Sequence, residues 1–335
     1  MKIFVTGAGG YIGNRLVHTL ANRGHQVHAF IRPTSSENTF SHPFIKIFKG
    51  ALADKRSIAM AMNDCTQVYH TASGCKLWTK KKKNFYEQNI GNTINVLDAA
   101  VECGVDKVVY TSCCSSWSPA NNHMHTENDP RIASFDNDYD LSKHLAEKTV
   151  KEYGKKGLSA VIVNPSHIYG PGSGRKSNGV NRFINVLLGG IVSPLPWHLD
   201  VKANYTFIDD VVNGHILAME KGSEGERYIL GGENISYREI IQAIKDNYSR
   251  TKLFVRTPGF VFNAWGVTEL IRARFTEYEP ILTPALTKRF LIAQTFDCTK
   301  AIAQLGYRIT PFSTGIKTTI DYLIQQSRKK WIPTL

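Results

Sequence analysis

The first thirteen residues limit the possible folds of this chain more than any other stretch. Residues 2–6 are a short apolar run, which predicts a buried strand of a parallel sheet. A turn follows with glycines three apart, at Gly7, Gly10 and Gly13, and apolar residues then recur with a helical period over 12–21. A strand, a glycine turn and a helix in this order predict a dinucleotide site, in which a pyrophosphate lies against the positive end of the helix.

Composition narrows the class of protein. The chain has 335 residues, enough for a large core, and its 42% hydrophobic and 21% charged residues are ordinary for a globular protein. No apolar stretch reaches the ~18–20 residues of a membrane span, and the chain opens in a strand rather than in a signal peptide. The six cysteines lack the spacing of metal ligands. We expect a cytoplasmic protein with reduced thiols, no metal and no membrane span.

The net charge of +13 is consistent with three classes of binding partner: nucleic acids, anionic membranes and anionic ligands. Its densest part is the run Lys80–Lys83, which lies before a predicted helix and is interpreted as a solvated loop. The sequence shows no recognition helix or aromatic-basic platform, so we expect no nucleic-acid partner. An anionic cofactor and a small-molecule substrate, free or bound to a carrier as a thioester, explain the charge more simply.

The second predicted strand, residues 24–32, ends where dinucleotide folds usually select their cofactor. An acidic residue at this place binds the ribose hydroxyls of NAD, whereas a basic one accommodates the extra phosphate of NADP. Here Arg32 occupies the place, and Ser35 follows in a short polar loop. A guanidinium presents a planar set of donors that suits a phosphate, so the sequence favours NADP(H) over NAD(H). The alternative is an exposed loop arginine.

Strands and helices then alternate along the chain. Predicted strands cover residues 45–50, 67–72 and 105–112, and a helix covers 84–104. This alternation predicts an α/β fold with a doubly wound parallel sheet, which binds its ligands at the carboxyl ends of the strands. Asn89 lies within the predicted helix although asparagine is a poor helix former. Asn89 is interpreted as a residue that forms a hydrogen bond from a helix bend to the active-site backbone. The alternative is an exposed polar residue.

A helix predicted from residue 138 to about 153 carries Tyr139 and Lys143 four residues apart, on one face. A phenol ordinarily has a pKa near ~10, and an ammonium group one turn away favours the phenolate. Such a pair forms a general acid that protonates a carbonyl oxygen while a hydride reaches the carbon. The lysine is also in place to hold the ribose of a nicotinamide cofactor.

These motifs are those of a known family. The chain resembles the extended short-chain dehydrogenases/reductases of the NAD-dependent epimerase/dehydratase superfamily. It is most similar to the branch of dihydroflavonol reductases, 3β-hydroxysteroid dehydrogenases and hopanoid-associated epimerase-like proteins. The matching segments, spread over about two thirds of the chain, are residues 6–13, 32–35, 69–72, 77–78, 89–100, 110–112, 139–147, 164–172 and 207–211.

The resemblance implies a role for each matched residue. Tyr139 would be the proton donor, Lys143 its electrostatic partner and a ribose ligand, and Asn89 a residue on the cofactor side. Pro165 and Ser166 would lie beside the nicotinamide, in the loop after a sixth strand. The residues expected to bind the cofactor are Gly7, Gly10, Tyr11, Ile12, Gly13, Arg32, Ser35, Ala72, Asn89, Lys143, Pro165 and Ser166.

Three positions depart from the family pattern. Cys113 stands where a serine normally polarises the substrate carbonyl, and a thiol is a weaker donor than a hydroxyl. Loss of such a donor costs about 10²–10³ in rate unless Ser115 or Ser116 takes over. Ala51 replaces an aspartate that usually contacts the adenine, and His167, a substrate contact or a packed side chain, replaces an arginine. The expected catalytic residues are Tyr139, Lys143, Cys113 and Ser115, and the expected substrate contacts are His167, Ser116 and Trp78.

The chain is expected to fold into two regions, one that binds the cofactor and one that binds the substrate. The cofactor-binding domain would comprise residues 1–165 and about 203–232, and the substrate-binding region about 166–202 and 233–335. The segment 173–202 is expected to be mobile. The many aromatic and aliphatic residues of 252–290 are interpreted as helical core or, alternatively, as a greasy substrate pocket.

The sequence therefore favours an NADP(H)-dependent oxidoreductase that reduces a ketone of a fairly apolar or carrier-bound substrate, with Tyr139 as the proton donor. Two alternatives stay open. One is a nucleotide-sugar epimerase or dehydratase that uses NAD, and the other is a cofactor-binding relative whose catalysis is weakened by Cys113. By family analogy, the helices at 85–103 and 139–153 would form a homodimer interface.

Overall fold

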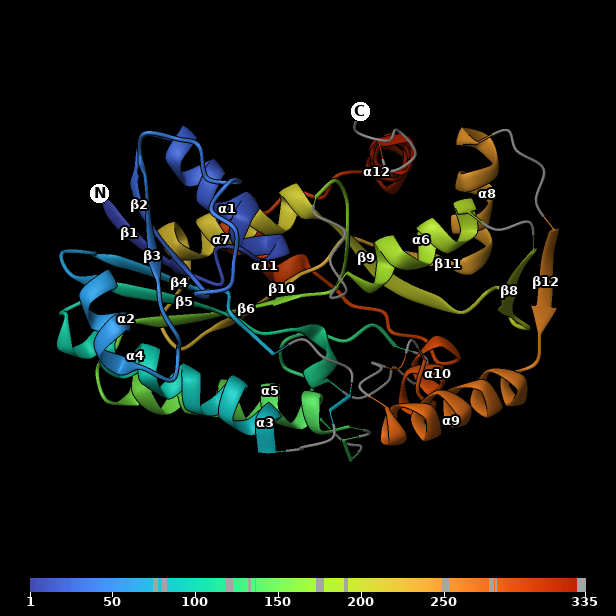
Figure 1. Cartoon of the computed structure of the whole chain (residues 1–335), viewed down its shortest axis with the longest axis horizontal. Coiled ribbons are helices and arrows are strands. Elements are labelled where there is room, and N and C mark those ends of the chain that lie inside the picture. The colour runs from blue at the N-terminus through green and yellow to red at the C-terminus, as the bar shows by residue number, and fades with distance from the viewer. Residues whose placement is uncertain are drawn as a thin grey trace.

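The computed structural model is built on a central sheet of seven parallel strands (Figure 1). Their spatial order is β10 (Arg227–Leu230), β6 (Ala160–Pro165), β5 (Lys107–Thr111), β4 (Gln67–His70), β1 (Lys2–Thr6), β2 (Gln26–Ile31) and β3 (Ile45–Lys49). The chain builds the sheet outward from β1 on one side and then returns to build the other side from β4. This doubly wound arrangement confirms the predicted fold class, and the reversal beside β1 is where such sheets bind ligands.

The structure describes residues 1–74, 78–79, 83–117, 123–131, 134–135, 137–172, 178–189, 192–248, 253–276, 280 and 282–329. Among these residues, every helix is too short or too polar to pass through a lipid bilayer.

Helices cover both faces of the sheet, as Figure 1 shows. One face carries α1 (Tyr11–Asn22), α7 (Ile208–Lys221) and α11 (Thr299–Leu305), and the other carries α2 (Lys55–Met62), α4 (Asn92–Glu102) and α5 (Asp138–Lys155). Alternate residues of β1 supply both cores: Val5 packs with Leu16 on the first face, and Phe4 packs with Ile58 on the second. This two-sided burial explains why the strands are continuous apolar runs in the sequence.

The helix predicted over 84–104 contains a break. The structure has α3 (Lys83–Tyr86), a short π-helix η1 (Glu87–Gly91) and then α4. The π turn adds one residue to a turn of helix and changes the direction of the side chains at Asn89. Apolar residues are buried on both sides of the break, with Phe85 before it and Val96 after it.

A second region follows β6. It contains a three-stranded sheet, in the order β11 (Glu233–Ser236), β9 (Lys202–Phe207) and β7 (His167–Tyr169), and a two-stranded sheet of β8 (Val192–Pro196) and β12 (Leu253–Thr257). Its helices are α6 (Gly179–Gly189), α8 (Tyr237–Asn247), α9 (Gly259–Phe275), α10 (Pro284–Phe290) and α12 (Phe312–Lys329).

The two expectations for this region differ in outcome. The segment 173–202, expected to be mobile, contains the regular elements α6 and β8, and its residues 173–177 and 190–191 lie outside the described part of the chain, so its mobility stays a prediction. The aromatic residues of 252–290 do not all lie in a core or line a pocket, because Phe260 and Phe275 of α9 are 75% and 82% exposed.

Candidate active site

The glycine turn after β1 has the tight geometry that a pyrophosphate requires. Gly7 has a φ of +65°, and a Cβ at this residue would lie 2.8 Å from the backbone of Ala72. The Gly10 N–H donates to the Gly7 carbonyl at 2.7 Å, and Gly10 begins α1 without a side-chain cap. Because α1 starts uncapped beside this close approach, its first N–H groups are placed to bind an anion.

The end of β2 lies beside the same turn. A Cβ on Gly9 would lie 3.7 Å from Ser35 Oγ, and the Ser35 N–H donates to the Arg32 carbonyl at 2.9 Å. Arg32 itself is exposed. Hydroxyl, guanidinium and helix N–H groups are the donors that a phosphorylated dinucleotide needs, so the residues present fit this cofactor.

Tyr11 and Ile12 supply the first turn of α1, but their side chains have other contacts. The Tyr11 hydroxyl donates to the Gly170 carbonyl at 2.8 Å, and burial raises the pKa of this phenol. Ile12 packs against the hydrophobic core. Any contribution of these two residues to cofactor binding therefore comes from their backbone.

Asn89 joins three segments from the π turn. Its Oδ1 accepts the Gly74 N–H at 2.8 Å and the Ser73 hydroxyl at 3.1 Å, and its Nδ2 donates to Ser142 Oγ at 2.8 Å. Asn89 thus holds the segment after β4 against α5, which is the bond from a helix bend to the backbone that the sequence suggested.

Lys143 is 1% exposed and lies under the carboxyl end of β5. Its Nζ donates to the Tyr110 hydroxyl and to the Thr111 carbonyl, both at 2.8 Å. Burial raises the pKa of Tyr110, an effect that the lysine partly opposes. His70 packs against the Tyr110 ring, and burial together with the charge of Lys143 lowers the pKa of His70 to about 3, so this histidine is neutral.

The hydroxyl of Tyr139 points at the residue that replaces the usual serine. It donates to Cys113 Sγ at 3.8 Å, and Cys113 Sγ lies 2.9 Å from Ser115 Oγ. The phenol, the thiol and the hydroxyl therefore form one row at the end of β5. An oxygen atom placed against this row would meet three potential donors.

Two further hydroxyls lie at the same edge of the sheet. Ser112 follows β5, and Ser166 follows Pro165, which is the last residue of β6 rather than part of the loop. Both Oγ atoms are buried and have no hydrogen-bond partner among the described residues. Buried polar atoms are nearly always paired, so these two indicate a polar ligand at this edge.

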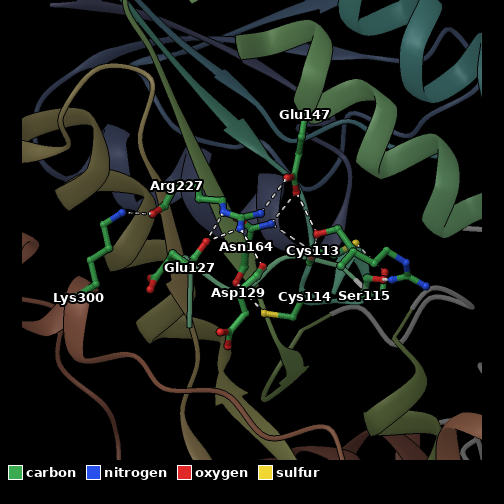
Figure 2. A network of polar contacts seen from close by, with 11 residues as sticks. Cys113, Cys114, Ser115, Glu127, Asp129, Glu147, Asn164, Arg227 and Lys300 are labelled. Carbon is green, nitrogen blue, oxygen red and sulfur yellow. Dashed lines mark hydrogen bonds and ion pairs between the residues drawn. The ribbon is translucent and has the colours of Figure 1, made fainter. Parts of the chain in front are cut away.

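Glu147 fixes the loop that carries Cys113, as Figure 2 shows. The carboxylate is 3% exposed, and its Oε1 accepts Asn164 Nδ2 at 2.7 Å and Ser116 Oγ at 3.2 Å. Both donors also bond the Cys113 carbonyl, at 3.2 Å from Asn164 and 2.9 Å from Ser116. Ser116 Oγ therefore supports the loop through these two bonds, and its predicted contact with the substrate stays a prediction.

The network continues to β10. Arg227 Nη1 lies 3.8 Å from Glu147 Oε2, and Arg227 Nε donates to the Glu127 carbonyl at 2.9 Å. Lys300 in turn donates to the Arg227 carbonyl at 3.0 Å (Figure 2). Glu147 has no role in the motifs read from the sequence, although it lies four residues after Lys143 and eight after Tyr139, on one face of α5.

His167 and Trp78 are the two remaining residues that were predicted to contact the substrate. His167 packs 5.6 Å from the ring of Tyr205, and its Nδ1 lies 3.2 Å from the Asn204 carbonyl, so it is held as a packed histidine. Trp78 is half-buried between β4 and α3, and residues 75–77 and 80–82, which include most of the lysine run, lie outside the described part.

The described residues contain one cluster with the composition of a metal site. The ligand atoms of His123, His125 and Asp129 lie within 4.8 Å of one another. Asp129 Oδ2 is 3.5 Å from both imidazoles and accepts the Thr126 N–H at 2.8 Å. The three side chains therefore form one close polar cluster within this loop.

The chain matches known proteins along most of its length. Residues 3–231 match the model of the "NAD dependent epimerase/dehydratase family". Sterol demethylase protein B of Methylococcus capsulatus is 31% identical over 249 residues, which are 73% of this chain and 74% of that protein. The 3 beta-hydroxysteroid dehydrogenase/Δ5→4-isomerase of Mycobacterium tuberculosis is 26% identical over 324 residues, 91% of this chain and 85% of that protein.

Solved structures share the fold. The NAD complex of UDP-glucose 4-epimerase from Thermus thermophilus superimposes with a TM-score of 0.75 at 22% identity and covers 97% of this chain and 99% of that one. Together with the family match over about two thirds of the residues, this shows that the chain is an NAD(P)-dependent enzyme of the NAD-dependent epimerase/dehydratase family, the extended short-chain dehydrogenases/reductases.

Proposed function

We propose that the protein is an NADP(H)-dependent oxidoreductase that reduces a ketone on a fairly apolar substrate. The row of Tyr139, Cys113 and Ser115 at the end of β5 carries this proposal. A nicotinamide cofactor supplies the hydride when it is bound. Tyr139 gives its hydroxyl proton to the carbonyl oxygen, while the thiol of Cys113 and the hydroxyl of Ser115 donate to the same oxygen.

Lys143 acts on Tyr139 from one helical turn away. Its ammonium group is anchored by Tyr110 and Thr111, so its positive charge stays beside the row and favours the phenolate that remains after proton transfer. The names of the two relatives, a sterol demethylase protein and a hydroxysteroid dehydrogenase, support an apolar polycyclic substrate.

Arg32 supports NADP(H) as the cofactor. Its guanidinium lies at the end of β2 next to Ser35, and no acidic residue occupies the place that would bind the ribose of NAD. The first test therefore measures the dissociation constants of NADPH and NADH for the wild type and for Arg32→Glu. Arg23→Glu, which changes an exposed arginine at the far end of α1, is the matched control.

We expect the wild type to bind NADPH more tightly, and Arg32→Glu to weaken NADPH by about 10–100-fold with little change for NADH, because charge-assisted hydrogen bonds to the phosphate are lost. Unchanged NADPH binding in Arg32→Glu, or tighter NADH binding by the wild type, would contradict the cofactor assignment. A panel of steroid ketones and UDP-sugars then separates the reductase from the alternative, an epimerase that keeps NAD through purification.

A further inference from the structure

Helix α9 presents an apolar face to solvent. Residues 260, 264, 267, 271 and 275 follow one another at intervals of three or four and therefore lie along one stripe of the helix. Phe260 is 75% exposed, Ile271 54% and Phe275 82%, and Val267 is also exposed. An apolar stripe of this length on the outer side of a helix usually marks a contact surface.

The opposite side of α9 is packed and explains how the helix is held. Gly266 approaches the start of α10 so closely that a Cβ would lie 3.0 Å from the backbone of Thr283 and Pro284. The acidic Glu269 is buried on this inner side. Figure 1 shows α9 at the edge of the molecule with α10 on its inner side. The stripe is thus a separate, solvent-facing side of α9 and not part of the hydrophobic core.

In the described residues 253–276 the exposed charged side chains carry one sign, and the acidic Glu277 and Glu279 come next in the sequence, outside the described part of the chain. Within residues 253–276 the exposed charged side chains are Arg256, Arg272 and Arg274, and the whole chain has a net charge of +13. A helix that combines Phe, Trp and aliphatic residues with flanking arginines is typical of elements that lie in the interface of an anionic membrane. A second copy of the chain would bring like charges together, which disfavours it as the partner.

The helix that carries the stripe is linked to α5 through α10. Thr287 of α10 bonds the carbonyl of Phe262 in α9 at 3.4 Å, and Arg289 at the end of α10 pairs with Asp140, the residue after Tyr139. Two packed elements thus connect the outer face of α9 to the start of the catalytic helix α5.

We propose that the apolar stripe of α9 binds the surface of an anionic lipid bilayer, with the stripe in the headgroup region and the arginines on the lipid phosphates. This contact is peripheral and needs no membrane span. The proposal does not depend on the reaction, because lipid binding is measured without turnover.

The experiment is sedimentation of the full-length protein with vesicles of phosphatidylcholine alone or mixed with phosphatidylglycerol. The test variant is Phe260→Ser/Ile271→Ser/Phe275→Ser, which changes only exposed side chains. The matched control is Met60→Ser/Val101→Ser/Val186→Ser, which changes three exposed apolar residues outside α9. Circular dichroism spectra of all proteins verify that each is folded.

We expect the wild type and the control to bind the mixed vesicles at least about tenfold more strongly than phosphatidylcholine, and to bind them less in high salt. The stripe variant should bind the mixed vesicles at least about tenfold more weakly than the wild type. Equal binding by the stripe variant, or no vesicle binding by the wild type, would overturn the proposal. Ultracentrifugation that shows a dimer lost in the stripe variant, without vesicle binding, would assign the face to a second copy instead.

Discussion

At the scale of single residues, Cys113 is the least expected member of the site. Its thiol lies between the Tyr139 hydroxyl, at 3.8 Å, and the Ser115 hydroxyl, at 2.9 Å. A thiol is a weak hydrogen-bond donor, so the row has two hydroxyl donors where a serine in place of Cys113 would give three. The structure offers Ser115 as its partial substitute, while Ser116 is engaged with Glu147.

This geometry predicts that Cys113→Ser raises the turnover number for ketone reduction, by about tenfold, because a hydroxyl stabilises a developing oxyanion better than a thiol does. Cys103→Ser, at a half-buried thiol in a different part of the sheet domain, is the control and should leave turnover unchanged. The turnover numbers are measured by steady-state kinetics at a saturating ketone concentration. A large fall in turnover for Cys113→Ser would mean that the thiol has a role of its own.

At the scale of elements, the site depends on how α5, β5, β6 and β10 are tied together. Glu147 of α5 joins Asn164 of β6 to the loop after β5, and Arg227 of β10 supports its second oxygen. Glu147 contacts none of the groups assigned to the reaction, so we regard it as a positioning residue.

We predict that Glu147→Ala lowers the free energy of unfolding by about 3 kcal/mol, because it removes the buried acceptor of Asn164 Nδ2 and Ser116 Oγ and the carboxylate that faces Arg227. The same change should lower kcat by about tenfold with little effect on NADPH binding, since only the Cys113 loop is released. Glu147→Gln keeps an acceptor oxygen and should recover most of both losses. Urea denaturation and kinetics provide the two values.

Glu152→Ala is the control for this series. Glu152 lies on the same helix but is exposed, and its pair with Lys155 is a surface ion pair worth little. A Glu147→Ala enzyme with the kcat of the wild type would show that the loop keeps its position without the carboxylate.

Some of these elements and contacts were predictable from the sequence and others were not. The strands, the glycine turn and the Tyr139–Lys143 spacing were predictable because each depends on neighbouring residues. The π turn at Asn89 was not, since one added residue hardly disturbs an apolar period. The partners of Glu147 and the exposure of α9 were not predictable either, because they depend on segments distant in the sequence that only the fold brings together or leaves apart.

At the scale of the whole molecule, buried histidines connect stability to pH. Burial, with the charge of Lys143, lowers the pKa of His70 to about 3, and burial lowers that of His215 to about 4 despite its bond to the Val211 carbonyl. In the unfolded chain both titrate near ~6.5. Between these values the unfolded chain binds more protons, so the stabilisation is complete above about pH 6.5 and is lost as the pH falls.

We therefore predict that the free energy of unfolding is lower at about pH 5 than at about pH 7.5, by about 2 kcal/mol for each of the two histidines. His215→Gln should remove its share of this loss. Urea denaturation at the two pH values is the measurement. Equal stability of the wild type at both would show that these imidazoles are protonated in the folded protein.

The central claim is that the Tyr139 hydroxyl gives its proton to the substrate carbonyl beside a dinucleotide held at the glycine turn. The most direct test is a single-turnover measurement of NADPH oxidation by a ketone substrate, for the wild type and Tyr139→Phe, together with the dissociation constant of NADPH. We predict that NADPH binds both proteins within about twofold and that Tyr139→Phe is slower by at least about 10²-fold. A single-turnover rate that is unchanged by the loss of this hydroxyl would contradict the claim.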